Sequence, residues 1–183
     1  MRPARHASGP AKPDPRRLLG KATTAFAEGG ASATWAVVLI ALVQRVRQAR
    51  VEVAGRVVGA IEQGLLVFVC AEPQDDESHA ANLVAKLLKL RIFADDAGKM
   101  NRSVQAVAGG LLIVSQFTLV ADTRAGNRPS FIGAAPSQLG RALYERVLAL
   151  ARESHPMVAA GEFGADMQVH LVNDGPVTIP LRV

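Results

Sequence analysis

Three short apolar runs, none of which contains a charged residue, constrain this chain more than any other feature. They are Val37–Val43, Gly64–Cys70 and Leu111–Val114. Each is far shorter than the ~18 residues that a membrane-spanning helix needs. Each has the length of a buried β-strand. We therefore expect these runs to form the central strands of a globular core.

Two helical segments lie between and after these strands. The first opens with Asp75–Glu77, acidic residues at the positive end of a helix, and continues with apolar residues at helical spacing up to Leu90. The second starts near Pro136 and ends before His155-Pro156. Alternating residues at 50–54 predict a hairpin, and residues 167–179 read as strand again. Strands at both ends and helices in the middle indicate an α+β layered fold.

The segment 1–38 has a different composition. It is rich in Ala, Gly, Pro, Ser and Arg and holds six basic against two acidic residues, whereas the rest of the chain holds 15 and 14. We expect this segment to be disordered. Three interpretations stay open: a basic tail that helps to hold RNA, a targeting segment with the Arg16-Arg17 pair, or an extension that follows from the choice of start codon.

Composition excludes several classes of protein. The net charge of +5 comes mainly from the segment 1–38, so it does not predict a nucleic-acid partner for the folding part. A single cysteine excludes a disulfide framework and a Cys-based zinc cluster. Aromatic residues are only 4% of the chain, too few for a base-stacking platform. Cys70 lies in an apolar run, so we interpret it as a core thiol rather than a nucleophile.

No familiar catalytic set assembles from the sequence. There is no phosphate-binding loop and no glycine fingerprint between a strand and a helix. The four histidines, at positions 6, 79, 155 and 170, lack metal-ligand spacing. We interpret His170, which lies in the middle of a predicted strand, as a surface or interface residue.

Ser115-Gln116-Phe117-Thr118 follows the third apolar run directly. Pockets in layered folds often lie where strands end, and an amide with two hydroxyls can hold an ester. Thr118 would be a nucleophile only with a base nearby, and none is visible. The simpler interpretation is a strand that becomes polar as it leaves the core.

Asn173-Asp174-Gly175-Pro176 also allows two interpretations. These residue types are common in hairpin turns. Alternatively, the Gly-Pro bond is cis, since an X–Pro bond tolerates the cis form far better than any other and glycine before it lowers the steric cost. Main-chain carbonyls turned to one side would then suit an ammonium group.

With these two motifs, the chain resembles the bacterial-type D-aminoacyl-tRNA deacylases, also called D-tyrosyl-tRNA deacylases. The resemblance runs from about Leu39 to Val183 and does not include the segment 1–38. We therefore expect an N-terminal extension, 1–38, and a deacylase domain, 39–183. The resemblance rests on six segments in order: Ala41–Val46, Arg91–Phe93 with Gly98–Asn101, Val114–Leu119, Arg128–Phe131, Ala165–Val169 and Leu171–Thr178.

The resemblance implies a layered β/β/α fold of the α+β class, with mixed sheets or a partial barrel and two main helices. It implies a cytoplasmic homodimer without metal or cofactor. Such enzymes hydrolyse the ester that joins a D-amino acid to the 3′ end of tRNA. They also remove glycine mischarged on alanine tRNA.

The resemblance also assigns residues by motif. The catalytic pocket would be lined by Ser115, Gln116, Phe117 and Thr118. Gly175 and Pro176 would form a cis motif that reaches into the partner subunit's pocket and rejects L-amino acids, and Arg45 would brace that motif. Phe163 and Met167 match the stretch that lines the adenosine side.

The implied reaction needs no side-chain base, because the 2′-hydroxyl of the terminal ribose helps to activate water. Amides around Phe117 and Thr118 would stabilise the oxyanion, and Thr118 as a covalent nucleophile is the rival mechanism. Seven basic residues are candidates to hold the acceptor end of tRNA: Lys86, Lys89, Arg91, Lys99, Arg102, Arg124 and Arg128.

Three other functions stay open. A tRNA-binding module with this fold would bind aminoacyl-tRNA without releasing the amino acid. An editing domain would act on another mischarged aminoacyl-tRNA, as the related domain of some threonyl-tRNA synthetases does. An unrelated esterase with a hydroxyl nucleophile would need a base that the sequence does not reveal.

Overall fold

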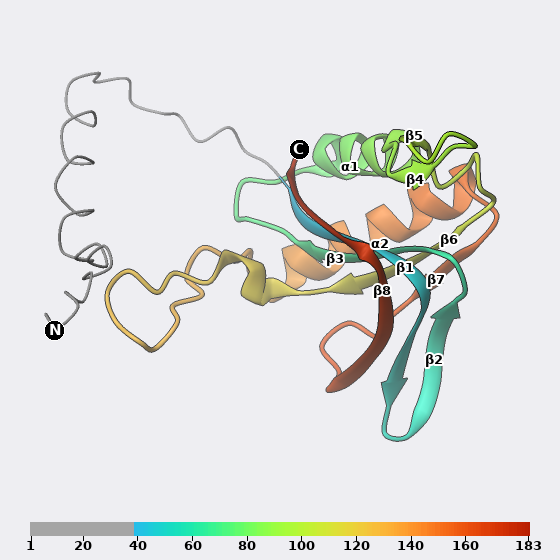
Figure 1. Ribbon diagram of the computed structural model, residues 1–183. Coiled ribbons are helices and arrows are strands. Elements are labelled where there is room, and N and C mark those ends of the chain that lie inside the picture. Colours follow the sequence, from blue (N-terminus) through green and yellow to red (C-terminus); the bar gives the residue numbers. More distant parts are fainter. Residues whose placement is uncertain (1–38) are drawn as a thin grey trace, which may run out of the picture. The chain divides into compact units, whose positions relative to one another are not determined.

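The computed structural model describes residues 39–183, drawn in colour in Figure 1. No helix in this part of the chain is long and apolar enough to cross a membrane. Its elements follow in the order β1 (Ile40–Val53), β2 (Arg56–Ile61), β3 (Gly64–Cys70), α1 (Glu77–Lys89), β4 (Phe93–Ala94), β5 (Met100–Arg102), β6 (Gly110–Ser115), the 3-10 helix η2 (Phe117–Val120), α2 (Ser137–Ser154), β7 (Val158–Ala160) and β8 (Met167–Arg182).

Strand β1 organises the larger sheet. One of its edges pairs with β8 from end to end, and the other pairs first with β3 and then, in continuing register, with β2. The turn between β1 and β2 contains Ala54 and Gly55, both with positive φ (49° and 75°), which is the conformation that a tight hairpin needs. The predicted hairpin is confirmed.

The sheet curls until it is nearly closed into a barrel. Beyond β3, strands β6 and β7 are added in parallel, which makes the sheet mixed. Strand β7 then packs against β2. The two backbones approach so closely that a β-carbon at Gly59 would lie only 2.3 Å from the carbonyl oxygen of Ala160. Only a residue without a side chain permits this approach of the two backbones.

The two helices lie side by side against the sheet (Figure 1). Helix α1 forms the crossover that parallel strands β3 and β6 require. At its start, the Asp76 carboxylate accepts hydrogen bonds from the amides of Ser78 and His79, and the His79 ring accepts one from the Asp76 amide. Helix α2 ends at Ser154, before His155-Pro156. Both predicted helices are confirmed.

The uninterrupted apolar runs are explained by two separate cores. On β3 and β6 the odd-numbered residues face the helices, as Leu65 and Leu111 do, while Leu66 and Leu112 point into the barrel. A strand buried on both faces has no solvent side that would require polar residues. The fold is therefore the predicted α+β arrangement, with a mixed sheet nearly closed into a barrel and two main helices.

One of the two interpretations of residues 173–176 is wrong. A hairpin turn is absent there, because β8 continues through these residues as one strand of 16 residues. Its register with β1 shifts between Gln44 and Gln48, so β8 carries extra residues at this point. We call this feature, residues 173–177, the Gly-Pro bulge. The predicted extension, residues 1–38, lies outside the described part of the chain.

The contact between β2 and β7 predicts the effect of one methyl group. Gly59→Ala would force the Ala160 carbonyl away and open the barrel, so we expect a loss of about 3 kcal/mol of unfolding free energy. Urea denaturation measures it. Gly133→Ala is the matched control, since its new β-carbon would have its nearest neighbour at 3.6 Å. Equal stability of the two variants would contradict this account of closure.

Candidate active site

A pocket of about 350 Å³ opens where the parallel strands β3 and β6 end. Pockets in sheets with parallel strands commonly lie at these carboxyl ends. The floor comes from the strand ends and the opposite wall from the start of α2 and the loop before β8. The lining residues are Val69, Cys70, Ala71, Ser115, Gln116, Phe117, Ala134, Ala135, Ser137, Gly140, Phe163 and Gly164. We call this the strand-end pocket.

Three of the four predicted catalytic residues line this pocket. Ser115 is the last residue of β6, and the Gln116 amide still donates to the carbonyl of Val69, at 2.7 Å. The chain then turns into η2, which leaves the Phe117 ring 58% exposed and edge-to-face with Phe131, at 5.2 Å between centroids. The strand therefore ends by presenting an amide, a hydroxyl and a ring to the pocket.

Thr118, the fourth predicted residue, is not among the lining residues. Its hydroxyl accepts a hydrogen bond from the Gln116 side-chain amide at 2.5 Å. In this contact the Gln116 side-chain nitrogen points to Thr118. In this arrangement Thr118 orients the side chain of Gln116, which lines the pocket.

Phe163, predicted for the adenosine side, forms part of the opposite wall. Its ring packs against Tyr144 at 5.9 Å, and the Arg141 guanidinium lies 4.7 Å from its centroid. The buried Tyr144 hydroxyl donates to the carbonyl of Ile113, at 2.9 Å, and its pKa is raised to about 12, mainly by burial. Phe163 is thus supported by a cation and an aromatic ring.

Met167, the other residue predicted for that side, lies elsewhere. It is the first residue of β8 and packs with the cluster inside the barrel. Its sulfur lies 2.8 Å from the place where a β-carbon at Gly161 would be. Met167 therefore packs next to Gly161 in the barrel cluster and is not among the residues that line the pocket.

The strand-end pocket has little acid–base capacity. Among its lining residues, all in the described part of the chain, there is no carboxylate, imidazole or ammonium group. Cys70 is the one ordinary titratable side chain in the lining, and burial followed by the charge of Glu72 raises its pKa to about 11. The thiol is therefore protonated at neutral pH, as the core-thiol interpretation predicts.

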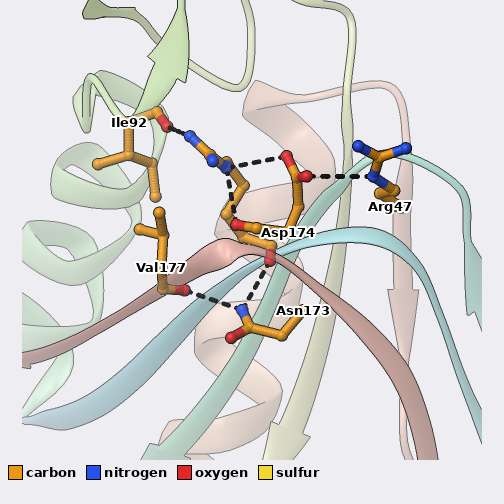
Figure 2. Close-up of polar contacts among 6 residues, drawn as sticks. Arg47, Ile92, Asn173, Asp174 and Val177 are labelled. Carbon is orange, nitrogen blue, oxygen red and sulfur yellow. Dashed lines mark hydrogen bonds and ion pairs between the residues drawn. The ribbon is translucent and has the colours of Figure 1, made fainter.

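The Gly-Pro bulge is held at its base by Arg45 from β1. The Arg45 side chain is 13% exposed and donates to two carbonyls, those of Asp174 and of Ile92 (Figure 2). It also forms an ion pair with the Asp174 carboxylate at 3.1 Å, whose other oxygen pairs with Arg47. Burial strengthens such charge-assisted contacts.

Asn173 holds the bulge from inside (Figure 2). Its amide donates to the carbonyls of Arg45 and Val177, at 2.9 and 3.0 Å, and so replaces ladder hydrogen bonds that the extra residues would interrupt. The tip of the bulge is exposed, and the Gly175–Pro176 peptide bond is cis, the form expected from the sequence. Gly175 has φ of 121°, and a β-carbon there would lie 2.8 Å from the Arg45 guanidinium.

The bulge and the strand-end pocket lie near opposite ends of β3. The bulge lies opposite Gln44–Gln48 of β1, where Arg45 and Val46 pair with the start of β3, whereas the pocket is at the end of β3, near Cys70. Six residues of strand separate these levels, roughly 20 Å. Gly175 and Pro176 are not among the residues that line the pocket. One chain therefore does not bring the two predicted motifs together.

The structure adds residues that sequence reasoning did not select. Ala134, Ala135 and Gly140 shape the pocket wall, but small apolar residues carry no chemical signature. The sequence alone predicts only a turn role for Asn173 and Asp174. Their position directly before Gly-Pro was the signal that could have marked them as residues that hold this motif. No three His, Cys, Asp or Glu side chains lie together as a metal site within residues 39–183.

The seven basic residues predicted to hold tRNA differ in their surroundings. Arg102 forms an ion pair with Asp96 at 2.7 Å, and Arg124 forms one with Asp122 at 2.6 Å. The Arg124 hydrogen bonds lower the pKa of Asp122 to about 2. Arg91 instead donates to the carbonyl and side chain of Asn101 and keeps its charge uncompensated by that contact.

Comparison with solved structures defines the class of fold. The structure of a probable eukaryotic D-amino acid tRNA deacylase superimposes with a TM-score of 0.71, covers 80% of this chain and 100% of that one, and is 18% identical in sequence, which shows the shared fold alone. The structure of a c-Myc DNA Unwinding Element Binding Protein gives a TM-score of 0.74 at 39% identity, over 78% of this chain and 97% of that one.

Sequence comparison then identifies the family. The family model for D-Tyr-tRNA(Tyr) deacylase matches residues 42–182. A D-aminoacyl-tRNA deacylase from Methylibium petroleiphilum is 70% identical over 145 residues, which are 79% of this chain and 95% of that protein. One from Acidovorax ebreus is 66% identical over 150 residues, 79% of this chain and 98% of that protein. The chain belongs to the D-Tyr-tRNA(Tyr) deacylase family.

The environment of Cys70 predicts a pH dependence of stability. In the unfolded chain the thiol ionises near its ordinary pKa of 9.0, whereas in the folded protein it stays protonated up to about pH 11. Its contribution to stability is complete below pH 9 and is lost as the pH rises through 11. Urea denaturation from pH 8 to 11 should therefore show a shallower alkaline decline for Cys70→Ser than for the wild type. Parallel declines would contradict the raised pKa.

Proposed function

We propose that this protein hydrolyses the ester bond of D-aminoacyl-tRNA in the cytoplasm, where tRNA is charged and used. One observation carries the proposal: a chain of this family has a strand-end pocket that offers hydrogen-bonding groups but no side-chain base. An aminoacyl ester is already activated, so orientation and oxyanion stabilisation suffice for its hydrolysis. A volume of about 350 Å³ lies within the usual range of small-molecule pockets.

The reaction that we propose is direct attack by water. Water adds to the ester carbonyl carbon, the bond from this carbon to the 3′ oxygen breaks, and the 3′ oxygen takes up a proton. The 2′-hydroxyl of the same ribose assists in activating the water. Main-chain amides around Phe117 and Thr118 stabilise the oxyanion, each such donor being worth about 3 kcal/mol. The products are tRNA and the free D-amino acid.

The groups that hold the substrate contact its ester and adenine and make no contact with the amino-acid side chain. Ser115, Gln116 and Phe117 contact the ester, and Phe163 packs against the adenine. Phe163 is suited to this because Arg141 and Tyr144 already fix its ring. Met167 backs this wall through Gly161 rather than touching the nucleotide.

We propose that the functional unit is a homodimer in which each Gly-Pro bulge completes the other protomer's pocket. The roughly 20 Å between bulge and pocket within one chain supports this, because the bulge cannot serve its own pocket at that separation. The bulge tip is exposed while its base is fixed by Arg45 and Asn173, as a projecting rigid element must be. Its main-chain carbonyls would accept hydrogen bonds from the substrate ammonium group.

This arrangement selects handedness by exclusion. With the ammonium and the carbonyl both fixed, an L side chain would point into the bulge, whereas a D side chain would point to solvent. One pocket then accepts many D-amino acids. Glycine has no side chain to exclude, so the same pocket would clear glycine mischarged on alanine tRNA.

Other readings of the site make different predictions. A tRNA-binding module would bind charged tRNA without releasing amino acid, and an editing domain for another mischarged tRNA would cleave an L-aminoacyl ester. An esterase with a hydroxyl nucleophile would need a base beside Thr118, and no lining residue of the pocket supplies one. The deacylase proposal alone requires release of D-amino acids with retention of L-amino acids.

The first test is deacylation of D-Tyr-, L-Tyr- and Gly-tRNA. We expect D-Tyr-tRNA to be cleaved at least ~100-fold faster than L-Tyr-tRNA, and Gly-tRNA to be cleaved as well, because steric exclusion acts only on an L side chain. Release of labelled amino acid gives the rates. Full chain and a version that starts at Leu39 should agree, if residues 39–183 form the catalytic domain. Comparable cleavage of L-Tyr-tRNA would refute the chiral filter.

Gly175→Ala serves as the contrasting variant in that test. The new β-carbon would lie 2.8 Å from the Arg45 guanidinium and 2.9 Å from a Val177 methyl, so the bulge must shift. We expect its kcat/KM for D-Tyr-tRNA to fall at least ~10-fold. The control, Gly55→Ala, also places alanine at a positive φ (75°), but its β-carbon would have no neighbour within 4 Å, so it should match the wild type.

Thr118 distinguishes the two mechanisms. Its hydroxyl is engaged by Gln116 and is not in the pocket lining, so we expect Thr118→Ala to keep D-Tyr-tRNA turnover within about tenfold of the wild type. Single-turnover rates measure this, with the exposed loop variant Thr123→Ala as control. Loss of nearly all turnover with intact tRNA binding would instead favour Thr118 as a nucleophile.

A further inference from the structure

A second hollow, of about 550 Å³, runs along the outer side of α1 and has a basic lining. It is formed by helix residues and by the link from α1 to β4, with the end of the chain at its other side. The lining residues are Asn82, Ala85, Lys86, Lys89, Leu90, Arg91 and Val183. We call it the basic hollow.

Three cations and no carboxylate side chain line this hollow. Lys86 and Lys89 are three residues apart on one helix, so their side chains are neighbours on its surface. Within residues 39–183 neither lysine has a carboxylate within ion-pair distance, in contrast to Arg102 and Arg124.

Arg91 is held in place beside the two lysines. Its guanidinium donates to the Asn101 carbonyl at 2.9 Å and to the Asn101 side-chain oxygen at 2.8 Å. Both acceptors are uncharged, so the positive charge remains available to an outside anion. A hollow with two mobile ammonium groups and one fixed guanidinium suits a phosphodiester backbone.

The position of the basic hollow relates it to the Gly-Pro bulge. Arg91 directly precedes Ile92, whose carbonyl accepts a hydrogen bond from Arg45, and Arg45 holds Asp174 (Figure 2). One short chain of contacts therefore links the edge of the hollow at Arg91 to the base of the bulge. A partner that receives the bulge would therefore meet the Arg91 edge of the hollow close by.

We propose that the Lys86, Lys89 and Arg91 side chains of one protomer bind the phosphate backbone of the tRNA whose aminoacyl end lies in the other protomer's strand-end pocket. This rests on the proposed dimer, in which the bulge crosses between protomers. Each tRNA is then held by both chains: its terminal adenosine and ester by one, and its acceptor-stem phosphates by the other. The nearly neutral folded part needs only this local set of cations.

The first experiment compares two charge-matched double variants. Lys86→Gln/Lys89→Gln removes two charges from the hollow, and Arg56→Gln/Arg152→Gln removes two exposed charges elsewhere, Arg152 also from the last turn of a helix. For the hollow variant, we expect KM for D-Tyr-tRNA to rise about tenfold with kcat within twofold, and the slope of log KM against log salt to fall by about 2. The control variant should match the wild type.

Two further measurements separate this proposal from the proposed function. Hydrolysis of 3′-D-tyrosyl-adenosine, which has no phosphate, should be unchanged in the hollow variant. Filter binding of uncharged tRNA should weaken about tenfold whether or not the protein is a deacylase. Unchanged tRNA binding would overturn the role of the hollow, whereas lost binding together with an inactive wild type would overturn the deacylase function alone.

Mixed dimers test which protomer supplies the cations. Ala135→Trp fills a strand-end pocket, so only the other protomer of a mixed dimer can act. If the contact crosses between protomers, a dimer with Ala135→Trp and the hollow substitutions on the same chain should show the raised KM. A dimer with these changes on different chains should keep the wild-type KM. The reverse pattern, or a monomer in light scattering, would overturn the crossed arrangement.

Discussion

The Arg45 guanidinium is the contact on which the rest of the site depends. It links β1, the end of the α1 layer at Ile92 and the Gly-Pro bulge of β8, and it is only 13% exposed. A buried charge without partners is costly, so the structure is strongly biased towards the one arrangement that supplies both carbonyls and the Asp174 carboxylate. The bulge is therefore fixed relative to the helix layer, although its tip is surrounded by solvent. A rigid tip is what selection by steric exclusion requires.

The sheet determines where this tip can act. Strands β3 and β6 are parallel because α1 crosses between them, and their carboxyl ends meet at one edge, where the strand-end pocket lies. Strand β8 lies across β1 from β3, and its extra residues face the opposite end of β3. The length of the strands therefore separates pocket from bulge within a chain. In the proposed dimer, a two-fold axis would bring each bulge to the other protomer's pocket without any change of fold.

Much of the fold was predictable, because its signals are local. The apolar runs of β3 and β6 reflect burial on both faces, and the helices are marked by Asp76 at one start and by His155-Pro156 at one end. The polar end of β6 is predicted by a local signal as well, since polar residues follow its apolar run directly. The bulge was not derivable as a bulge, since its cause is a register shift against β1, at the other end of the described chain, and Asn173 suits a turn equally well. Met167 illustrates the same limit: a motif assigns it to a neighbourhood, and only packing places it behind Gly161.

The distribution of charge fits the separation of the strand-end pocket from the Gly-Pro bulge. The pocket lining holds no carboxylate or imidazole, and its thiol stays protonated, so little in it would favour one amino-acid side chain over another. Outside the pocket, Arg102 and Arg124 are neutralised by neighbouring aspartates, whereas the cations along α1 are not. A site that must accept many D-amino acids on many tRNAs gains nothing from base or side-chain readout. The proposed site would need a fixed wall for handedness and a few charges for a backbone common to every tRNA, and the contact between Arg45 and the Ile92 carbonyl links the elements that carry the two.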